Sequence, residues 1–176
     1  LNRRLRNQSR NEDIQDLAIK CAKEIAQSED IKIEPLSKEI KGEKAAVLTL
    51  SDFHFGLEIN EFNNVYNEEI FERRINKLLE KTIEYINEVG RIYVLGLGDY
   101  MSGIIHTTTR IENRESIVQQ TIKISEYIYQ LLSILSQYVE VFYYDISDNH
   151  GRVFANKDEC FNDENFSLFI RWYLKA

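Results

Sequence analysis

Apolar positions in the second part of the chain follow two different periods. Short apolar runs typical of buried strands occur at Ala45–Leu50, Arg91–Leu95 and Val139–Tyr144. Between these runs, apolar residues recur at helical spacing over residues 67–90 and 112–138. A strand and helix that repeat in this order predict βαβ crossovers and a mainly parallel sheet. We therefore expect an α/β fold.

The first of these two helices has clear start and stop signals. Asn67 is a good N-cap, and Glu68 and Glu69 lie in the first turn, where the helix dipole favours negative charge. Gly90 supplies the stop. A further helix is expected to begin at Phe166. The apolar stripe of the first helix consists of Phe71, Ile75, Leu78, Leu79, Ile83 and Ile86, and that of the second of Ile117, Ile124, Ile128, Leu131 and Leu135.

The pattern before the first strand differs from that of the main domain. Residues 11–28 place apolar side chains on one face at helical spacing, and residues 29–44 contain mixed charge and the only proline, Pro35. We expect an N-terminal helical appendage and connector at residues 1–44 and a main domain at residues 45–176. The mixed charge of the appendage helix favours packing, a partner contact or self-association over membrane binding.

Composition narrows the possible classes of function. The chain has 176 residues and a net charge of −7, which argues against a nucleic-acid coat protein. No apolar run reaches the roughly 18–20 residues of a membrane span, and the arginine-rich start does not resemble a signal peptide. Cys21 and Cys160 lie in unrelated segments and form no disulfide framework or zinc pattern. We expect a cytoplasmic protein without a membrane partner.

Polar side chains follow each of the three predicted strands. Asp52 and His54 come after the first strand, Asp99 after the second, and Asn149 and His150 after the third. Loops at the carboxyl ends of parallel strands lie at one edge of a sheet, so these side chains are expected to meet. Asp52 and His54 are two residues apart in a stretch expected to be extended, which would place both side chains on one side. Carboxylate, amide and imidazole groups of this kind bind metal ions.

In order and spacing, the three strings resemble motifs of the calcineurin-like metallophosphoesterases. The strings are Asp52-Phe53-His54, Gly98-Asp99 and Asp148-Asn149-His150, where the family has Asp-x-His, Gly-Asp and Gly-Asn-His. The resemblance implies an αββα sandwich of two sheets flanked by helices, of which this chain supplies mainly the first βαβαβ half. Within the superfamily, the chain looks most like the phage- or prophage-type members that are described as resembling DNA-repair exonucleases.

The resemblance also implies a role for each ligand. Asp52 and His54 would bind one metal, Asp99 would bridge to a second, and Asn149 would bind that second metal. His150 would be the catalytic residue, stabilising the transition state or protonating the leaving oxygen. The implied cofactors are two divalent ions, with Mn as first choice and Fe, Zn or Mg as alternatives. The implied activity is hydrolysis of a phosphoester by a water that two metal ions activate. The implied substrate is nucleic acid, DNA included. The implied compartment is the cytoplasm, that of the host cell if the gene belongs to a phage.

Two departures from the family pattern leave alternatives open. Asp148 replaces the usual glycine, and a positive φ at this position would strain the loop. The chain has three histidines, His54, His106 and His150, and lacks the later Gly-His-x-His motif, so it supplies about half of a two-metal site. His106 matches no family position and is expected on a surface loop. We expect a chain truncated at both ends. Two alternatives to a nucleic-acid hydrolase stay open: a non-catalytic remnant or binding module of the same fold, and a phosphatase that acts on phosphoprotein or small nucleotides.

Overall fold

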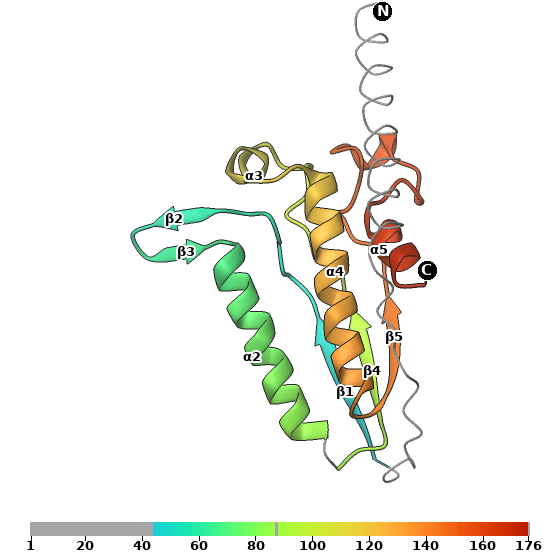
Figure 1. Ribbon diagram of the computed structural model, residues 1–176. Coiled ribbons are helices and arrows are strands. Elements are labelled where there is room, and N and C mark those ends of the chain that lie inside the picture. The colour runs from blue at the N-terminus through green and yellow to red at the C-terminus, as the bar shows by residue number, and fades with distance from the viewer. Residues whose placement is uncertain (1–43, 87, 176) are drawn as a thin grey trace, which may run out of the picture. The chain divides into compact units, whose positions relative to one another are not determined.

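A three-stranded parallel sheet with helices on one face forms the centre of the fold (Figure 1). The computed structural model describes residues 44–86 and 88–175. β1 (Ala45–Leu50), β4 (Arg91–Gly96) and β5 (Glu140–Asp145) pair in that order, all parallel. The predicted α/β class and the parallel sheet are therefore confirmed. The helix expected at residues 11–28 and the connector up to residue 43 lie outside the described residues.

The crossover helix between β1 and β4 begins where the sequence predicts, but it ends at Ile86, before the predicted stop at Gly90. This helix, α2 (Glu68–Ile86), begins after Asn67, whose Oδ1 accepts a hydrogen bond from the backbone N–H of Ile70 at 2.9 Å. The cap expected from the sequence is thus present. The third strand begins one residue later than predicted, because the N–H of Val139 still bonds to the Leu135 carbonyl of the preceding helix at 3.2 Å.

The helix expected at residues 112–138 is present, but it begins five residues later than predicted, and a short helix that was not predicted precedes it. α3 (Thr107–Glu112) ends before α4 (Ile117–Ser136) begins. The Arg114 N–H bonds to the Gly56 carbonyl at 3.0 Å, which takes the intervening backbone out of the helical ladder. Ser116 then starts α4 with a capping box that it shares with Gln119.

Short elements at the two ends of the described domain complete the fold. A hairpin of β2 (Ile59–Glu61) and β3 (Asn64–Tyr66), which the sequence did not predict, precedes α2. The expected last helix is present as α5 (Ser167–Tyr173), after the 3₁₀ turn η1 (Lys157–Glu159). Arg171 of α5 donates to the β5 residue Asp145 at 2.8 Å, which ties the last helix to the sheet.

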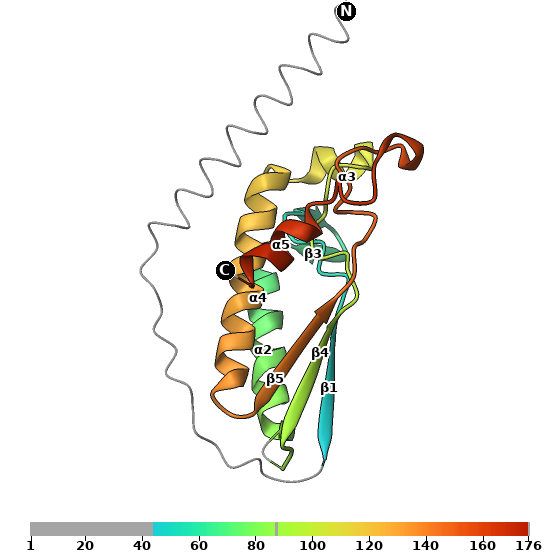
Figure 2. The same ribbon diagram turned by 90° about the vertical axis from the view of Figure 1, so that its right-hand side faces the viewer.

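The two faces of the sheet differ sharply in burial. Helices α2, α4 and α5 lie on one side, and no described element covers the other (Figure 2). The open face includes Val47 at 64% and Tyr144 at 57% exposure, and Tyr93 stacks there on Phe142 with ring centroids 5.3 Å apart. None of the described helices is long and apolar enough to cross a membrane. The centre of the covered face contains Leu50, Ile92, Val94, Ile124, Ile128, Leu131 and Leu135, each at most 3% exposed.

Candidate metal centre

Backbone hydrogen bonds join the loops that follow β1 and β4. The Asp52 N–H donates to the Gly98 carbonyl at 3.2 Å, and the His54 N–H donates to the Asp99 carbonyl at 3.0 Å. Asp52, His54 and Asp99 have φ angles of 55°, 45° and 54°, and in the described part of the chain they are the non-glycine residues with positive φ. The extended stretch expected at residues 52–54 is therefore wrong. Left-handed backbone in such residues is costly and often marks functional sites.

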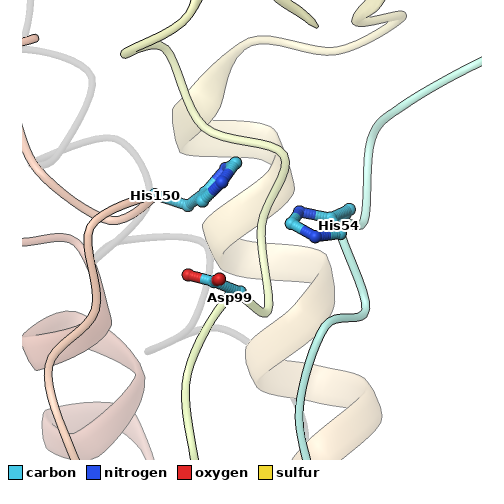
Figure 3. Close-up of side chains that lie close together, drawn as sticks. All are labelled: His54, Asp99 and His150. Atoms are coloured by element: carbon cyan, nitrogen blue, oxygen red, sulfur yellow. The ribbon is translucent and has the colours of Figure 1, made fainter.

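Three of the predicted site residues meet at the carboxyl edge of the sheet. One potential ligand atom from each of His54, Asp99 and His150 lies within 4.8 Å of the other two. The three side chains come from three different loops and gather around a common space (Figure 3). The rings of His54 and His150 meet edge to face, with centroids 4.6 Å apart. The predicted convergence of the three loops is confirmed for these residues.

The environment of His150 determines which ring nitrogen can bind a ligand. His150 is 8% exposed, and its Nδ1 lies 2.7 Å from the carbonyl oxygen of Ser102. A carbonyl can only accept, so Nδ1 is the donor, and in the neutral ring Nε2 carries the lone pair. Metal-binding histidines usually donate the N–H of their other ring nitrogen to a backbone carbonyl, a carboxylate or water, as His150 does to Ser102.

The charges around His54 and Asp99 also suit a cation. Asp99 Oδ1 is buried and has no hydrogen-bond partner among the described residues. Burial lowers the pKa of His54, and the neighbouring His150 lowers it further against the opposing effect of Asp99. A neutral imidazole beside a half-buried carboxylate with one unpaired oxygen can bind a divalent ion. Two imidazoles and one carboxylate fit Mn, Fe or Zn, so the residues present fit the metal that the sequence implied.

The other two predicted ligands lie at the margin of this cluster. The Asp52 side chain is 71% exposed, and its Oδ1 is 4.0 Å from His54 Nε2. Asn149 is exposed and lines a groove together with Asp99. The structure therefore groups His150 with His54 and Asp99, whereas Asp52 and Asn149 flank them.

The strain expected at Asp148 is absent, because this residue does not have a positive φ. Its Oδ1 accepts the Gly151 N–H at 2.6 Å, and burial raises the pKa of its carboxyl group. The glycine that the packing requires lies in the neighbouring loop. Gly98 has a φ of 93°, and a Cβ on it would lie 2.5 Å from the Cβ of Asp148. Asp148 thus fills the space that Gly98 leaves open.

Gln120 is a supporting residue that the sequence analysis did not identify. It is fully buried in α4, where its Oε1 accepts the Gly103 N–H at 3.1 Å and its Nε2 donates to the Glu115 carbonyl at 2.9 Å. These bonds hold the loop that carries Asp99 against the helix. The available signal was a glutamine within the apolar stripe, between Ile117 and Ile124.

His106 lies on the surface at the start of α3, as expected, but it is not remote from the cluster. Its ring meets the His150 ring with centroids 5.5 Å apart. All three histidines of the chain are therefore neighbours.

Comparison with known proteins gives a relative but no function. The chain is 35% identical over 120 residues to the SPbeta prophage-derived uncharacterized protein YonJ of Bacillus subtilis strain 168. The matched region is 66% of this chain and 29% of the relative, so the chain spans less than a third of that protein. No known protein family and no solved structure matches the chain.

Proposed function

We propose that this chain carries the first half of a metal-dependent phosphoester hydrolase site of the metallophosphoesterase type. The observation that carries the proposal is the His54–Asp99–His150 cluster, whose potential ligand atoms lie within 4.8 Å of one another. These residues follow three adjacent parallel strands, in the order of the family's motifs. The prophage origin of the relative agrees with a phage-type enzyme.

Each residue of the centre has a defined part in this proposal. His54 and His150 offer imidazole nitrogens to a divalent ion, and Asp99 offers the oxygen that has no other partner. In this proposal, Asp52 and Asn149 would complete the coordination from the exposed side. Bound divalent ions would supply a water of lowered pKa and charge compensation for the phosphoryl oxygens. Because its Nδ1–H is held by Ser102, His150 has Nε2 for one role at a time: it either binds the ion or, when the ring is protonated and not bound to the ion, passes a proton to a leaving oxygen.

The open face of the sheet supports the finer fold that this function implies. Parallel sheets are usually covered on both faces, whereas this one exposes Val47, Tyr144 and the Tyr93–Phe142 pair. In the αββα arrangement that we propose, a second sheet covers this face and brings the remaining histidine ligands. Nucleic acid is the substrate class that we favour, and the chain acts on it in the cytoplasm.

Hydrolysis by the chain and by an Asp99→Asn variant tests the proposal. The substrates are bis-p-nitrophenyl phosphate and linear DNA, each with Mn²⁺. Asparagine tolerates the left-handed backbone of position 99, so the variant removes the charge while keeping the loop. We expect Mn²⁺ binding, followed by calorimetry, to weaken by at least tenfold, and any hydrolysis to fall by at least as much.

A matched control is Asp163→Asn, which removes an exposed carboxylate from the loop before α5. It should bind Mn²⁺ as the wild-type chain does. Equal Mn²⁺ affinity and equal hydrolysis in the wild type and the Asp99 variant would overturn the proposal. Tight binding without hydrolysis, even in a longer protein that includes the later histidines, would instead favour the non-catalytic binding module.

A further inference from the structure

A groove of about 560 Å³ opens beside the metal centre. Asp99 and Asn149 line it, together with Leu97 before Asp99, the residues after β5 and the segment around η1. This volume lies within the usual range for small-molecule sites. A ligand that fills the groove would therefore lie next to the carboxylate that we assign to the metal.

Two cationic side chains line this groove without an anionic partner. Arg152 uses its Nε to donate to the Asn149 carbonyl at 3.2 Å, and its terminal amino groups bind no other described residue. The ammonium group of Lys157 has no ion pair or hydrogen bond within residues 44–175 as described. The groove also contains the carboxylates of Asp99 and Asp148, so an anion is expected at the Arg152–Lys157 end. A guanidinium with free terminal groups is well suited to phosphate.

An aromatic ring stands beside these cations. Phe161 lines the groove and is 76% exposed, and the apolar side chains of Leu97 and Ile146 contribute to the same wall at 49% and 56% exposure. Proteins that bind single-stranded nucleic acid combine cationic side chains, which contact the phosphates, with exposed aromatic rings, on which the bases stack. A duplex offers no free base face to such a ring, because its bases stack on one another.

The wall of the groove is held in place by Asn165. Its Nδ2 donates to the Asp148 carbonyl at 2.6 Å, and its Oδ1 accepts the Ser167 N–H at 2.9 Å. A Cβ on Gly151 would lie 2.2 Å from this Oδ1, so the glycine permits the close approach. These bonds connect the loop after β5 to the start of α5, beside the cations and the ring that line the groove.

We propose that this groove binds single-stranded nucleic acid. Phosphates lie against Arg152 and Lys157, and one base stacks on Phe161. The strand then passes Asp99 with a phosphodiester facing the metal centre. This inference rests on the proposed function, because the strand is taken to lead to the proposed metal centre. It names single-stranded nucleic acid as the substrate class of that centre.

Binding of a fluorescein-labelled thymidine oligonucleotide to the full chain tests the groove directly. Fluorescence anisotropy is measured with EDTA present, so that no hydrolysis can take place. We expect Phe161→Ala to weaken binding about tenfold, which is typical for the loss of one base stack. The control Phe62→Ala removes a fully exposed ring from the β2–β3 turn and should change nothing.

The lysine is tested by the salt dependence of the same binding. Lys157→Ala should reduce the slope of log affinity against log salt by about 0.7, the value for one lost phosphate contact on a single strand. Lys77→Ala, an exposed lysine on α2, should leave the slope unchanged.

Three results would overturn the inference: no measurable affinity for the oligonucleotide, equal affinity for a duplex of the same length, or equal weakening by the Phe161 and Phe62 variants. Equal affinity for thymidine monophosphate would reassign the groove to a mononucleotide. Hydrolysis of bis-p-nitrophenyl phosphate without oligonucleotide binding would overturn this inference and leave the proposed function standing. Oligonucleotide binding without hydrolysis, even in a longer protein that includes the later histidines, would do the reverse.

Discussion

At the scale of single residues, the backbone rather than neighbouring side chains positions the candidate ligands. Asp52, His54 and Asp99 all have left-handed backbone, which costs of the order of 1 kcal/mol or more for each residue. The bonds from the Asp52 and His54 amides to the loop of Gly98 and Asp99 offset this cost. The strained loops therefore depend on each other, and their side chains remain available for a ligand.

Asp99 is expected to destabilise the chain when no metal is bound. The residue is half-buried, its Oδ1 is buried without a partner, and an unsatisfied acceptor of this kind opposes folding. In EDTA, Asp99→Asn should raise the free energy of unfolding by about 1 kcal/mol, because the amide is neutral and tolerates the backbone of this position. Urea denaturation measures the change.

The sign of this effect should reverse when metal is added. Mn²⁺ at a hundred times its dissociation constant stabilises a protein that binds it by about 2.7 kcal/mol, and the variant should gain much less. Asp163→Asn should behave as the wild type in both buffers, since its carboxylate is exposed. A variant that is less stable in EDTA, or that gains as much from Mn²⁺, would show that Asp99 is not a ligand.

At the scale of elements, Lys123 of α4 links that helix to the start of α2 and to the segment before its own N-cap. Its ammonium group lies 2.9 Å from Glu68 Oε1 and 2.5 Å from Glu115 Oε1. Burial lowers the pKa of Lys123, but the hydrogen bonds to Glu115 and Glu68 outweigh it and raise this pKa above the ordinary value. The Glu115 side chain is only 15% exposed, so it depends on this partner.

Replacement of this lysine by a neutral side chain should therefore be costly. Lys123→Met is expected to lower the free energy of unfolding by about 1–2 kcal/mol, less than for a fully buried pair because water screens the half-exposed lysine. Lys81→Met on α2 is the matched control, since it breaks an exposed pair with Glu84 and should lower the free energy of unfolding less than Lys123→Met does. Thermal or urea unfolding of both variants shows whether the loss of Lys123 lowers the free energy of unfolding more than the loss of Lys81 does.

The elements that the sequence predicts are those whose pattern is local. The apolar run predicted both bounds of β1, and the Asn67 cap predicted the start of α2, because each signal depends on neighbouring residues. The break before α4 also had a local signal, the Ser116 and Gln119 capping box. The β2–β3 hairpin had none, since its three-residue strands pair only with each other.

The candidate site divides in the same way. Strand order placed the loops of His54, Asp99 and His150 at one edge of the sheet, so their convergence followed from the sequence. The positive φ of Asp52 and His54 did not, because it arises from bonds to a loop that lies more than 40 residues further along the chain. The role of Gln120 likewise depends on a tertiary contact, with Gly103.

At the scale of the whole molecule, net charge and the proposed substrate oppose each other. A chain with a net charge of −7 repels polyanions at long range, so affinity for nucleic acid has to come from local groups. Arg152 and Lys157 lie at one edge of the sheet, and divalent ions bound by the proposed metal centre would add positive charge there. Binding is therefore expected to be sensitive to salt and concentrated at that edge.

The open face of the sheet should make the chain associate with itself when nothing else covers it. Val47 and Tyr144 are more than half exposed on the two edge strands, and contiguous apolar patches of this kind bind other apolar surfaces. In light scattering, a Val47→Lys, Tyr144→Lys double variant should show no rise of average molecular mass with protein concentration. Its free energy of unfolding should lie within about 1 kcal/mol of the wild-type value. Phe62→Lys changes an exposed ring outside the sheet and should leave association as it is.

If the double variant associates like the wild type, the face is not adhesive, and the argument for a second sheet upon it fails. If association is lost only in the double variant, the face requires a cover, as the proposed sandwich provides.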